Sequence, residues 1–133
     1  GAGLPGIPLA ILRPELRVTL LDAVGKKVRF LDHVKRSLPL DNIEPVHARV
    51  EDWQPGVMFD TVTWRAVGPL ADTAQAVRHL LAPGARLLAM KGRRPDEELD
   101  ALPDWLDVAG VQPLEIPDLH ETRHLVIMCP THS

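Results

Sequence analysis

The chain has 133 residues, of which 45% are hydrophobic and 25% charged, and its formal net charge is -3. These values are typical of one folded domain, so we expect a single domain over residues 1–133 and exclude a disordered chain. The negative net charge excludes a wholly basic nucleic-acid-binding protein, and the apolar runs are too short to span a membrane. The single cysteine, Cys129, permits no internal disulfide, and we expect a cytoplasmic protein with no membrane partner.

The first six residues carry a glycine pattern that is typical of nucleotide-binding loops. Gly1, Gly3 and Gly6 are spaced G-x-G-x-x-G, and an apolar helical pattern follows over residues 4–12. Glycines let the backbone turn tightly and approach a ligand, and a helix N-terminus offers free N–H groups. Asp22 ends the next apolar run, and a carboxylate at this distance accepts hydrogen bonds from ribose hydroxyls. The pattern predicts a nucleotide site at this loop and Asp22, but it is specific only when a strand precedes it, and none does.

The rest of the sequence alternates between apolar runs typical of strands and amphipathic stretches typical of helices. We expect helices at residues 4–12, 25–38, 70–81 and 96–102, and strands at residues 17–21, 46–50, 59–65, 85–91, 105–116 and 124–129. A turn at Pro83 and Gly84 ends the third helix, and Gly110 predicts a bend in the fifth strand. This alternation indicates an α/β fold with parallel β-α-β units and a doubly wound sheet.

Two basic clusters stand out against the negative net charge. The helix expected at residues 25–38 has one apolar face, and its other face carries Lys26, Lys27, Arg29, Lys35 and Arg36. The second cluster is the run Lys91-Gly92-Arg93-Arg94. For the basic face of the helix, solvation and contact with nucleic acid are both open.

Seven segments taken together resemble one bacterial family. They are residues 1–8, 20–22, 25–31, 48–52, 65–66, 91–92 and 123–126. The combination resembles the glucose-inhibited-division protein B family, the small-subunit ribosomal RNA methyltransferase G enzymes, from the first residue to about Cys129. The resemblance implies a Rossmann-like class I S-adenosylmethionine-dependent methyltransferase fold, incomplete at its N-terminus, with the cofactor at the carboxyl ends of the strands. It also implies methylation of N7 of a guanine, so the expected partner is 16S rRNA or a small ribosomal subunit precursor.

The resemblance also implies which residues contact S-adenosylmethionine. They are Gly1, Gly3, Leu4, Asp22, Val50, Glu51 and Arg65. Guanine N7 carries a lone pair, so its methylation needs no general base and depends on holding the base in line with the methyl group. We expect Arg65, Lys91 and Arg123 to be catalytic by binding RNA and orienting the base. Three plainer roles stay open: a helix cap for Asp22, a turn for Glu51 and a solvated strand end for Lys91.

The chain departs from this family at its beginning. Family members carry an N-terminal helical region and a first strand before the point that corresponds to Gly1, and that strand lies at the centre of the sheet. Its absence predicts open strand edges and self-association through them. Two alternatives to an active methyltransferase therefore stay open: a catalytically inactive truncated fragment, and a nicotinamide-binding Rossmann protein, which the glycines and Asp22 alone would allow.

Residues 120–124 read His-Glu-Thr-Arg-His, which matches the H-E-x-x-H pattern of zinc proteases. That pattern binds zinc only on a helix, which places both imidazoles on one face. Pro117 precedes it closely and a β-type run follows over residues 125–129. We therefore expect no metal site here.

Overall fold

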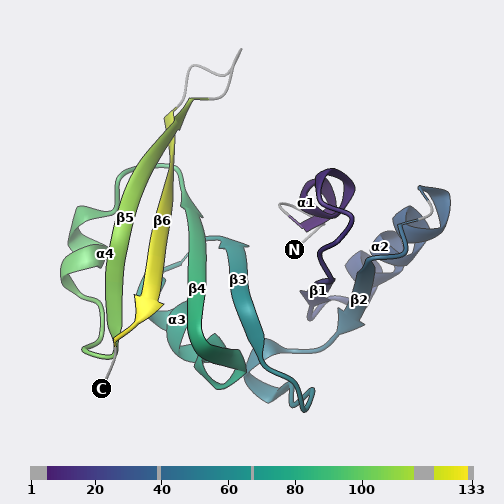
Figure 1. Ribbon diagram of the computed structural model, residues 1–133, viewed down its shortest axis with the longest axis horizontal. Helices are drawn as coiled ribbons and strands as arrows, with labels where there is room; N and C mark the ends of the chain where they lie inside the picture. The colour runs from purple at the N-terminus through teal and green to yellow at the C-terminus, as the bar shows by residue number, and fades with distance from the viewer. Residues whose placement is uncertain (1–5, 39, 67, 116–121, 132–133) are drawn as a thin grey trace. The chain divides into compact units, whose positions relative to one another are not determined.

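The computed structural model describes residues 6–38, 40–66, 68–115 and 122–131. The chain divides into two compact units, Gly1–Gln54 and Pro55–Ser133, and each is described by itself (Figure 1). The single domain expected over residues 1–133 stays a prediction. No helix in the described ranges is long and apolar enough to cross a membrane.

The first unit is a two-stranded parallel sheet with two helices on one of its faces (Figure 1). Its elements in chain order are α1 (Gly6–Leu12), β1 (Val18–Asp22), α2 (Gly25–Ser37), β2 (Ile43–His47) and the 3-10 helix η1 (Val50–Asp52). Each of α1, β1, α2 and β2 contributes one side chain to a single buried hydrophobic cluster, namely Ala10, Leu20, Leu31 and Ile43. Because both helices contribute to the same cluster, both cover the same face of the sheet.

A glycine at the first residue of α1 lets the helix pack closely on β1. A Cβ atom at Gly6 would collide with Cδ2 of Leu20, a buried side chain at the centre of β1. In nucleotide-binding loops the third glycine permits this close approach of helix and strand. Gly6 therefore agrees with the predicted loop, of which residues 1–5 lie outside the described residues.

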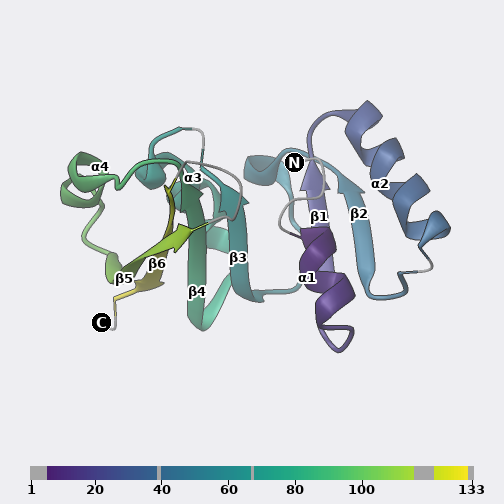
Figure 2. The same ribbon diagram turned by 90° about the horizontal axis from the view of Figure 1, so that it is seen from above.

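The second unit is a four-stranded sheet with strand order β3-β4-β6-β5. Its elements are β3 (Phe59–Arg65), α3 (Leu70–Val77), the 3-10 helix η2 (Arg78–Leu80), β4 (Leu81–Lys91), α4 (Asp96–Asp100), β5 (Leu106–Glu115) and β6 (Thr122–Pro130). β3 and β4 are parallel, whereas β6 is antiparallel to both β4 and β5. Figure 2 shows α3 and α4 together on one side of this sheet. The buried residues of α3 and of the strands are Leu70, Ala74, Val77, Leu81, Ala85, Leu87, Ala89, Leu106, Val126 and Met128.

The mixed α/β class with parallel strand pairs is confirmed, and three predicted boundaries are wrong. The second strand begins at Ile43 rather than residue 46, and Pro45 lies inside it opposite Leu20. A proline is tolerated here because β2 is an edge strand of its sheet. The helix expected at residues 70–81 changes to a 3-10 turn after Val77. The strand expected from residue 85 begins at Leu81, and Gly84, with a φ of 76°, lies inside it where the register against β3 shifts.

Candidate functional site

The carboxyl ends of β1 and β2 bring Asp22 close to the residues that follow β2. Asp22 lies opposite His47 in the parallel register, and the N–H of Ala48 donates a hydrogen bond to the Asp22 carbonyl at 3.0 Å. Val50 and Glu51 follow in η1. Ligands of open parallel sheets bind at this end of the strands. Three of the predicted cofactor contacts, Asp22, Val50 and Glu51, thus lie at one end of one sheet.

The Asp22 carboxylate is half-buried and ordered by the loop that follows it. Its Oδ1 accepts a hydrogen bond from the backbone N–H of Val24 at 2.8 Å. Burial raises the pKa of Asp22, whereas hydrogen bonding, first of all from the Val24 N–H, and nearby positive charge lower it, and the net pKa lies below its ordinary value of 3.8. The N-cap of α2 is Val24, which receives no side-chain cap, so Asp22 forms a local turn rather than a helix cap. An ionised carboxylate accepts hydrogen bonds and cannot donate them, which suits ribose hydroxyls.

His47 holds the loop between Asp22 and α2, and the sequence patterns did not identify it. Its Nε2 lies 3.1 Å from the carbonyl oxygen of Ala23. A carbonyl only accepts, so this nitrogen carries the proton. The ring also packs on the start of α2, where a Cβ at Gly25 would lie 3.2 Å from His47 Cε1. Only its position at the end of β2 could have indicated this role. That position was hidden because the strand was predicted at residues 46–50 rather than Ile43–His47.

The three predicted catalytic residues lie at one end of the four-stranded sheet. Arg65 and Lys91 end the parallel strands β3 and β4. Arg123 begins β6 beside His124, which pairs with Lys91 in the antiparallel register. Arg65 is exposed, and Arg123 is half-buried. The structure therefore brings these three residues to neighbouring strand ends within the second unit.

Lys91 is engaged in a network that links three elements. Its Nζ lies 2.8 Å from Glu98 Oε1 and donates a hydrogen bond to the Gly68 carbonyl at 2.8 Å. The same Glu98 oxygen accepts the N–H of Leu70, at the start of α3, at 3.0 Å. Only 12% of the Lys91 side chain is exposed, which excludes the alternative of a solvated strand end. We call these four residues the Lys91–Glu98 brace; it ties β4 and α4 to the loop that follows Arg65.

Two buried polar atoms of the second unit lack a hydrogen-bond partner among the described residues. They are Nε1 of Trp64 and Nδ1 of His124. His124 lies in β6, so the end of the H-E-x-x-H pattern falls on a strand; His120 and Glu121 lie outside the described residues. The described ranges contain no group of three or more His, Cys, Asp or Glu side chains that could hold a metal ion.

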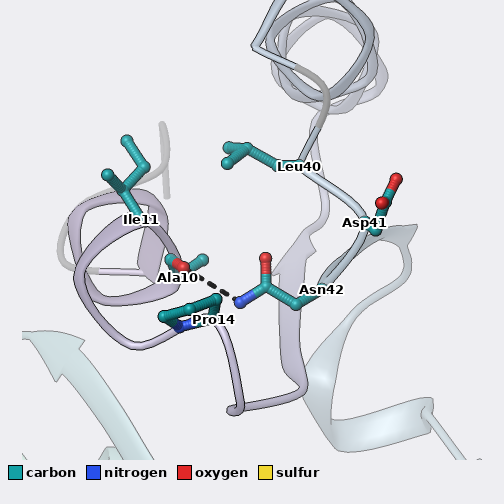
Figure 3. A pocket seen from close by; sticks show the side chains of 6 residues that line it. All are labelled: Ala10, Ile11, Pro14, Leu40, Asp41 and Asn42. Atoms are coloured by element: carbon teal, nitrogen blue, oxygen red, sulfur yellow. Dashed lines mark hydrogen bonds between the residues drawn. The ribbon is translucent and has the colours of Figure 1, made fainter.

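A pocket of about 300 Å³ lies at the other end of the first unit (Figure 3). It is lined by Ala10, Ile11, Pro14, Leu40, Asp41 and Asn42. Figure 3 shows the Asn42 amide nitrogen directed at the carbonyl of Ala10, to which it donates a hydrogen bond at 3.0 Å. Asn42 precedes β2, so the pocket lies at the amino ends of the strands, away from Asp22. It is therefore not the predicted cofactor site.

Comparison with known proteins gives a family match over most of the chain. The GidB family model, described as rRNA small subunit methyltransferase G, matches residues 1–126. The chain is 47% identical over 132 residues to the ribosomal RNA small subunit methyltransferase G of Enterobacter sp. (strain 638), which covers 99% of this chain and 64% of that protein. The chain spans about three fifths of the length of the curated relatives that it matches.

Solved structures of distant proteins share the fold. TrmN from Thermus thermophilus aligns with a TM-score of 0.74 at 17% identity, covering 98% of this chain and 42% of that chain. An rRNA methylase from Streptococcus thermophilus aligns with a TM-score of 0.65 at 15% identity, covering 99% of this chain and 82% of that chain. Such likeness shows the fold alone, which is the Rossmann-like class I methyltransferase fold.

Proposed function

Because this chain belongs to the rRNA small subunit methyltransferase G family, we propose that it methylates N7 of a guanine in 16S rRNA with S-adenosylmethionine as methyl donor. The partner would be 16S rRNA or a small ribosomal subunit precursor in the cytoplasm. The observation that carries the proposal is the ionised carboxylate of Asp22 at the carboxyl end of β1, where this fold binds its cofactor and where Val50 and Glu51 follow the paired strand β2.

The described residues at this end fit the adenosine part of the cofactor. Asp22 supplies an acceptor for ribose hydroxyls, and the nearby η1 turn supplies Val50 and Glu51 for the base. The loop between Asp22 and α2 is held by His47, which keeps the acceptor in place. The proposed set is completed by Gly1, Gly3, Leu4 and Arg65.

S-adenosylmethionine, when bound, supplies a methyl group on a positively charged sulfur. That methyl group would pass to the lone pair of guanine N7, with the new N–C bond replacing the C–S bond and the positive charge moving to the guanine ring. No proton is transferred, so none of the chain's residues has to act as a general base. The chain's contribution is position: Arg65 and Arg123 would bind RNA and orient the base, and Lys91 would hold the loop after Arg65 through the brace.

The proposal is tested by methyl transfer to deproteinised 16S rRNA and to small ribosomal subunits, with a tritium-labelled methyl group. Borohydride reduction followed by aniline cleavage breaks RNA at 7-methylguanosine and so locates the product. We expect one labelled, cleavable guanine, and Arg123→Ala should lower the transfer rate at least about tenfold. Label at a site that resists aniline would contradict N7 as the acceptor.

The inactive-fragment alternative has one observation in its favour. Among the described residues β1 pairs only with β2 and β3 only with β4, so each leaves one strand edge open within its sheet. Open edges favour self-association. A folded chain that forms dimers by sedimentation and binds neither S-adenosylhomocysteine nor NAD would support this alternative, and NAD binding alone would support the nicotinamide alternative.

A further inference from the structure

The outer face of α2 carries a line of basic side chains that the proposed cofactor site does not use. Lys26, Arg29, His33 and Arg36 are spaced three, four and three residues apart, and all four are exposed. Residues three and four apart are neighbours on a helix surface, so the four form one continuous row. We call this row the α2 stripe. The helix buries its opposite face through Val28 and Leu31.

An exposed aromatic ring lies beside the α2 stripe. Phe30 is 52% exposed, four residues after Lys26 and three residues before His33. The side chains that anchor α2 in the core are Val28 and Leu31, and Leu31 is completely buried. Phe30 therefore presents an apolar ring at the surface, directly next to positive charge.

The charges of the α2 stripe are not neutralised within the described part of the chain. None of the ion pairs formed there involves Lys26, Arg29 or Arg36. The only acidic residue of α2 is the half-buried Asp32, which lies three residues after Arg29 and four before Arg36 but forms no ion pair with either in the described part of the chain. The chain as a whole carries a net charge of -3, so this concentration of cations on one helix face runs against its overall charge. A negatively charged partner is the complement of such a surface.

We propose that the α2 stripe binds a single-stranded segment of the RNA substrate, with phosphates on Lys26, Arg29 and Arg36 and an unstacked base on Phe30. Single-stranded RNA is recognised by cations along its backbone together with aromatic rings on which its bases stack. An acidic protein surface would use the cations and leave the ring without a stacking partner. The inference rests on the proposed function, because it assigns a surface to the same RNA substrate.

The electrostatic part is tested by neutralising two cations of the stripe. The double variant Lys26→Gln with Arg29→Gln is compared with a matched control, Arg17→Gln with Arg86→Gln, two exposed arginines outside α2. Binding of a fluorescein-labelled RNA hairpin with a guanine-containing single-stranded loop is followed by anisotropy over a series of salt concentrations. The logarithm of the binding constant falls linearly with the logarithm of the salt concentration, and each lost phosphate contact makes this slope less steep by about 0.7. The stripe variant should therefore make it less steep by about 1.4. Equal slopes in the stripe and control variants would overturn the proposal.

The stacking part is tested with Phe30→Leu, which keeps an apolar side chain but removes the aromatic ring. We expect at least about fivefold weaker binding of the RNA hairpin and unchanged binding of heparin, which has charges but no bases. Unchanged RNA binding in this variant would overturn the stacking contact.

Titration of all variants with S-adenosylhomocysteine separates this inference from the proposed function. Affinity equal to that of the unmodified chain, together with weakened RNA binding, supports the stripe. If neither the unmodified chain nor any variant binds S-adenosylhomocysteine, the proposed function fails. The comparison of RNA binding between the stripe and control variants still shows whether the α2 stripe binds RNA.

Discussion

Asp22 is the residue through which the fold would hold the ribose of the cofactor. Its Oδ1 is 2.8 Å from the Val24 nitrogen, and the Ala48 N–H binds its carbonyl oxygen, so both ends of the residue are ordered. Hydrogen bonds to a charged acceptor are worth more than those to a neutral one. The loss of this charge should therefore affect ligand binding more than it affects folding.

Asp22→Asn should weaken binding of S-adenosylhomocysteine by roughly tenfold or more, because an amide replaces a charged acceptor. Isothermal titration calorimetry measures the change. Asp60→Asn, an exposed carboxylate in β3, is the matched control and should leave the affinity unchanged. Equal affinity in both variants would remove Asp22 from the site.

The same residue should contribute to the pH dependence of stability. The pKa of Asp22 in the folded chain lies below its ordinary value of 3.8, so the unfolded chain takes up a proton at higher pH than the folded chain. Its stabilising effect is complete above the ordinary value and is lost as the pH falls through the lowered pKa. Urea denaturation at about pH 6 and about pH 3 should therefore show a smaller loss of unfolding free energy in Asp22→Asn than in the unmodified chain. An equal loss of unfolding free energy in Asp22→Asn and in the unmodified chain would contradict the lowered pKa of Asp22.

Asn42 closes the C-terminal end of α1. Its side-chain nitrogen donates to the carbonyls of Ala10 at 3.0 Å and Leu16 at 3.0 Å, and its backbone carbonyl accepts the Val18 N–H at 2.8 Å. Asn42→Ala should lower the free energy of unfolding by about 1–3 kcal/mol, because carbonyls at the helix end lose their donor. Asn42→Asp should lower it at least as much, since a carboxylate cannot donate.

Urea denaturation checks both Asn42 variants. Asp41→Ala is the control, because Asp41 is an exposed neighbour in the same turn. A loss of stability in Asp41→Ala equal to that in Asn42→Ala would show that the turn, rather than the amide, is responsible.

At the scale of elements, the Lys91–Glu98 brace fixes the start of α3 and the loop before it. Pro69 provides no side-chain cap for α3, and the Glu98 carboxylate of α4 takes that place at the Leu70 N–H. A negative charge near a helix N-terminus is favourable, and Lys91 neutralises it from the end of β4. The ion pair between Lys91 and Glu98 thus connects β4, α4 and the start of α3, and only 12% of the lysine side chain is exposed.

Glu98→Gln should lower the free energy of unfolding by about 1–3 kcal/mol, because the Lys91 ammonium loses its counter-charge in a largely buried place. Glu97→Gln, an exposed neighbour on α4, should change it by less than about 0.5 kcal/mol. The double variant Lys91→Met with Glu98→Gln should be less destabilised than the sum of its single variants. Urea denaturation measures the four variants beside the unmodified chain, and additive losses would show that the two residues do not act as a pair.

For the whole molecule, local pattern predicted the elements better than it predicted their contacts. The strand at Phe59–Arg65 and the helix at Gly25–Ser37 are confirmed because each has its own periodicity and clear flanking residues. The bend predicted at Gly110 is confirmed as a register shift between Val108 and Gly110. The start of β2 was missed because Pro45 argues against a strand unless that strand lies at a sheet edge.

The site was predictable only in part. The glycine pattern pointed to Asp22 and the family resemblance to Arg65 and Lys91, and all three lie at the carboxyl ends of parallel strands, where this kind of fold gathers ligand residues. His47 and Glu98 could not be identified, since their roles depend on contacts between distant segments. No local signal distinguishes Glu98 from the other acidic residues of α4. The specific contacts with cofactor and RNA stay predictions.

The most direct measurement is calorimetric titration of the 133-residue chain with S-adenosylhomocysteine, with NAD as a parallel titration. We predict saturable binding of S-adenosylhomocysteine and none of NAD, because the Asp22 end of the first unit fits the adenosine of the methyl donor in a fold of the methyltransferase class. A folded chain, judged by circular dichroism, that binds no S-adenosylhomocysteine would contradict the proposal that this polypeptide is itself a methyltransferase.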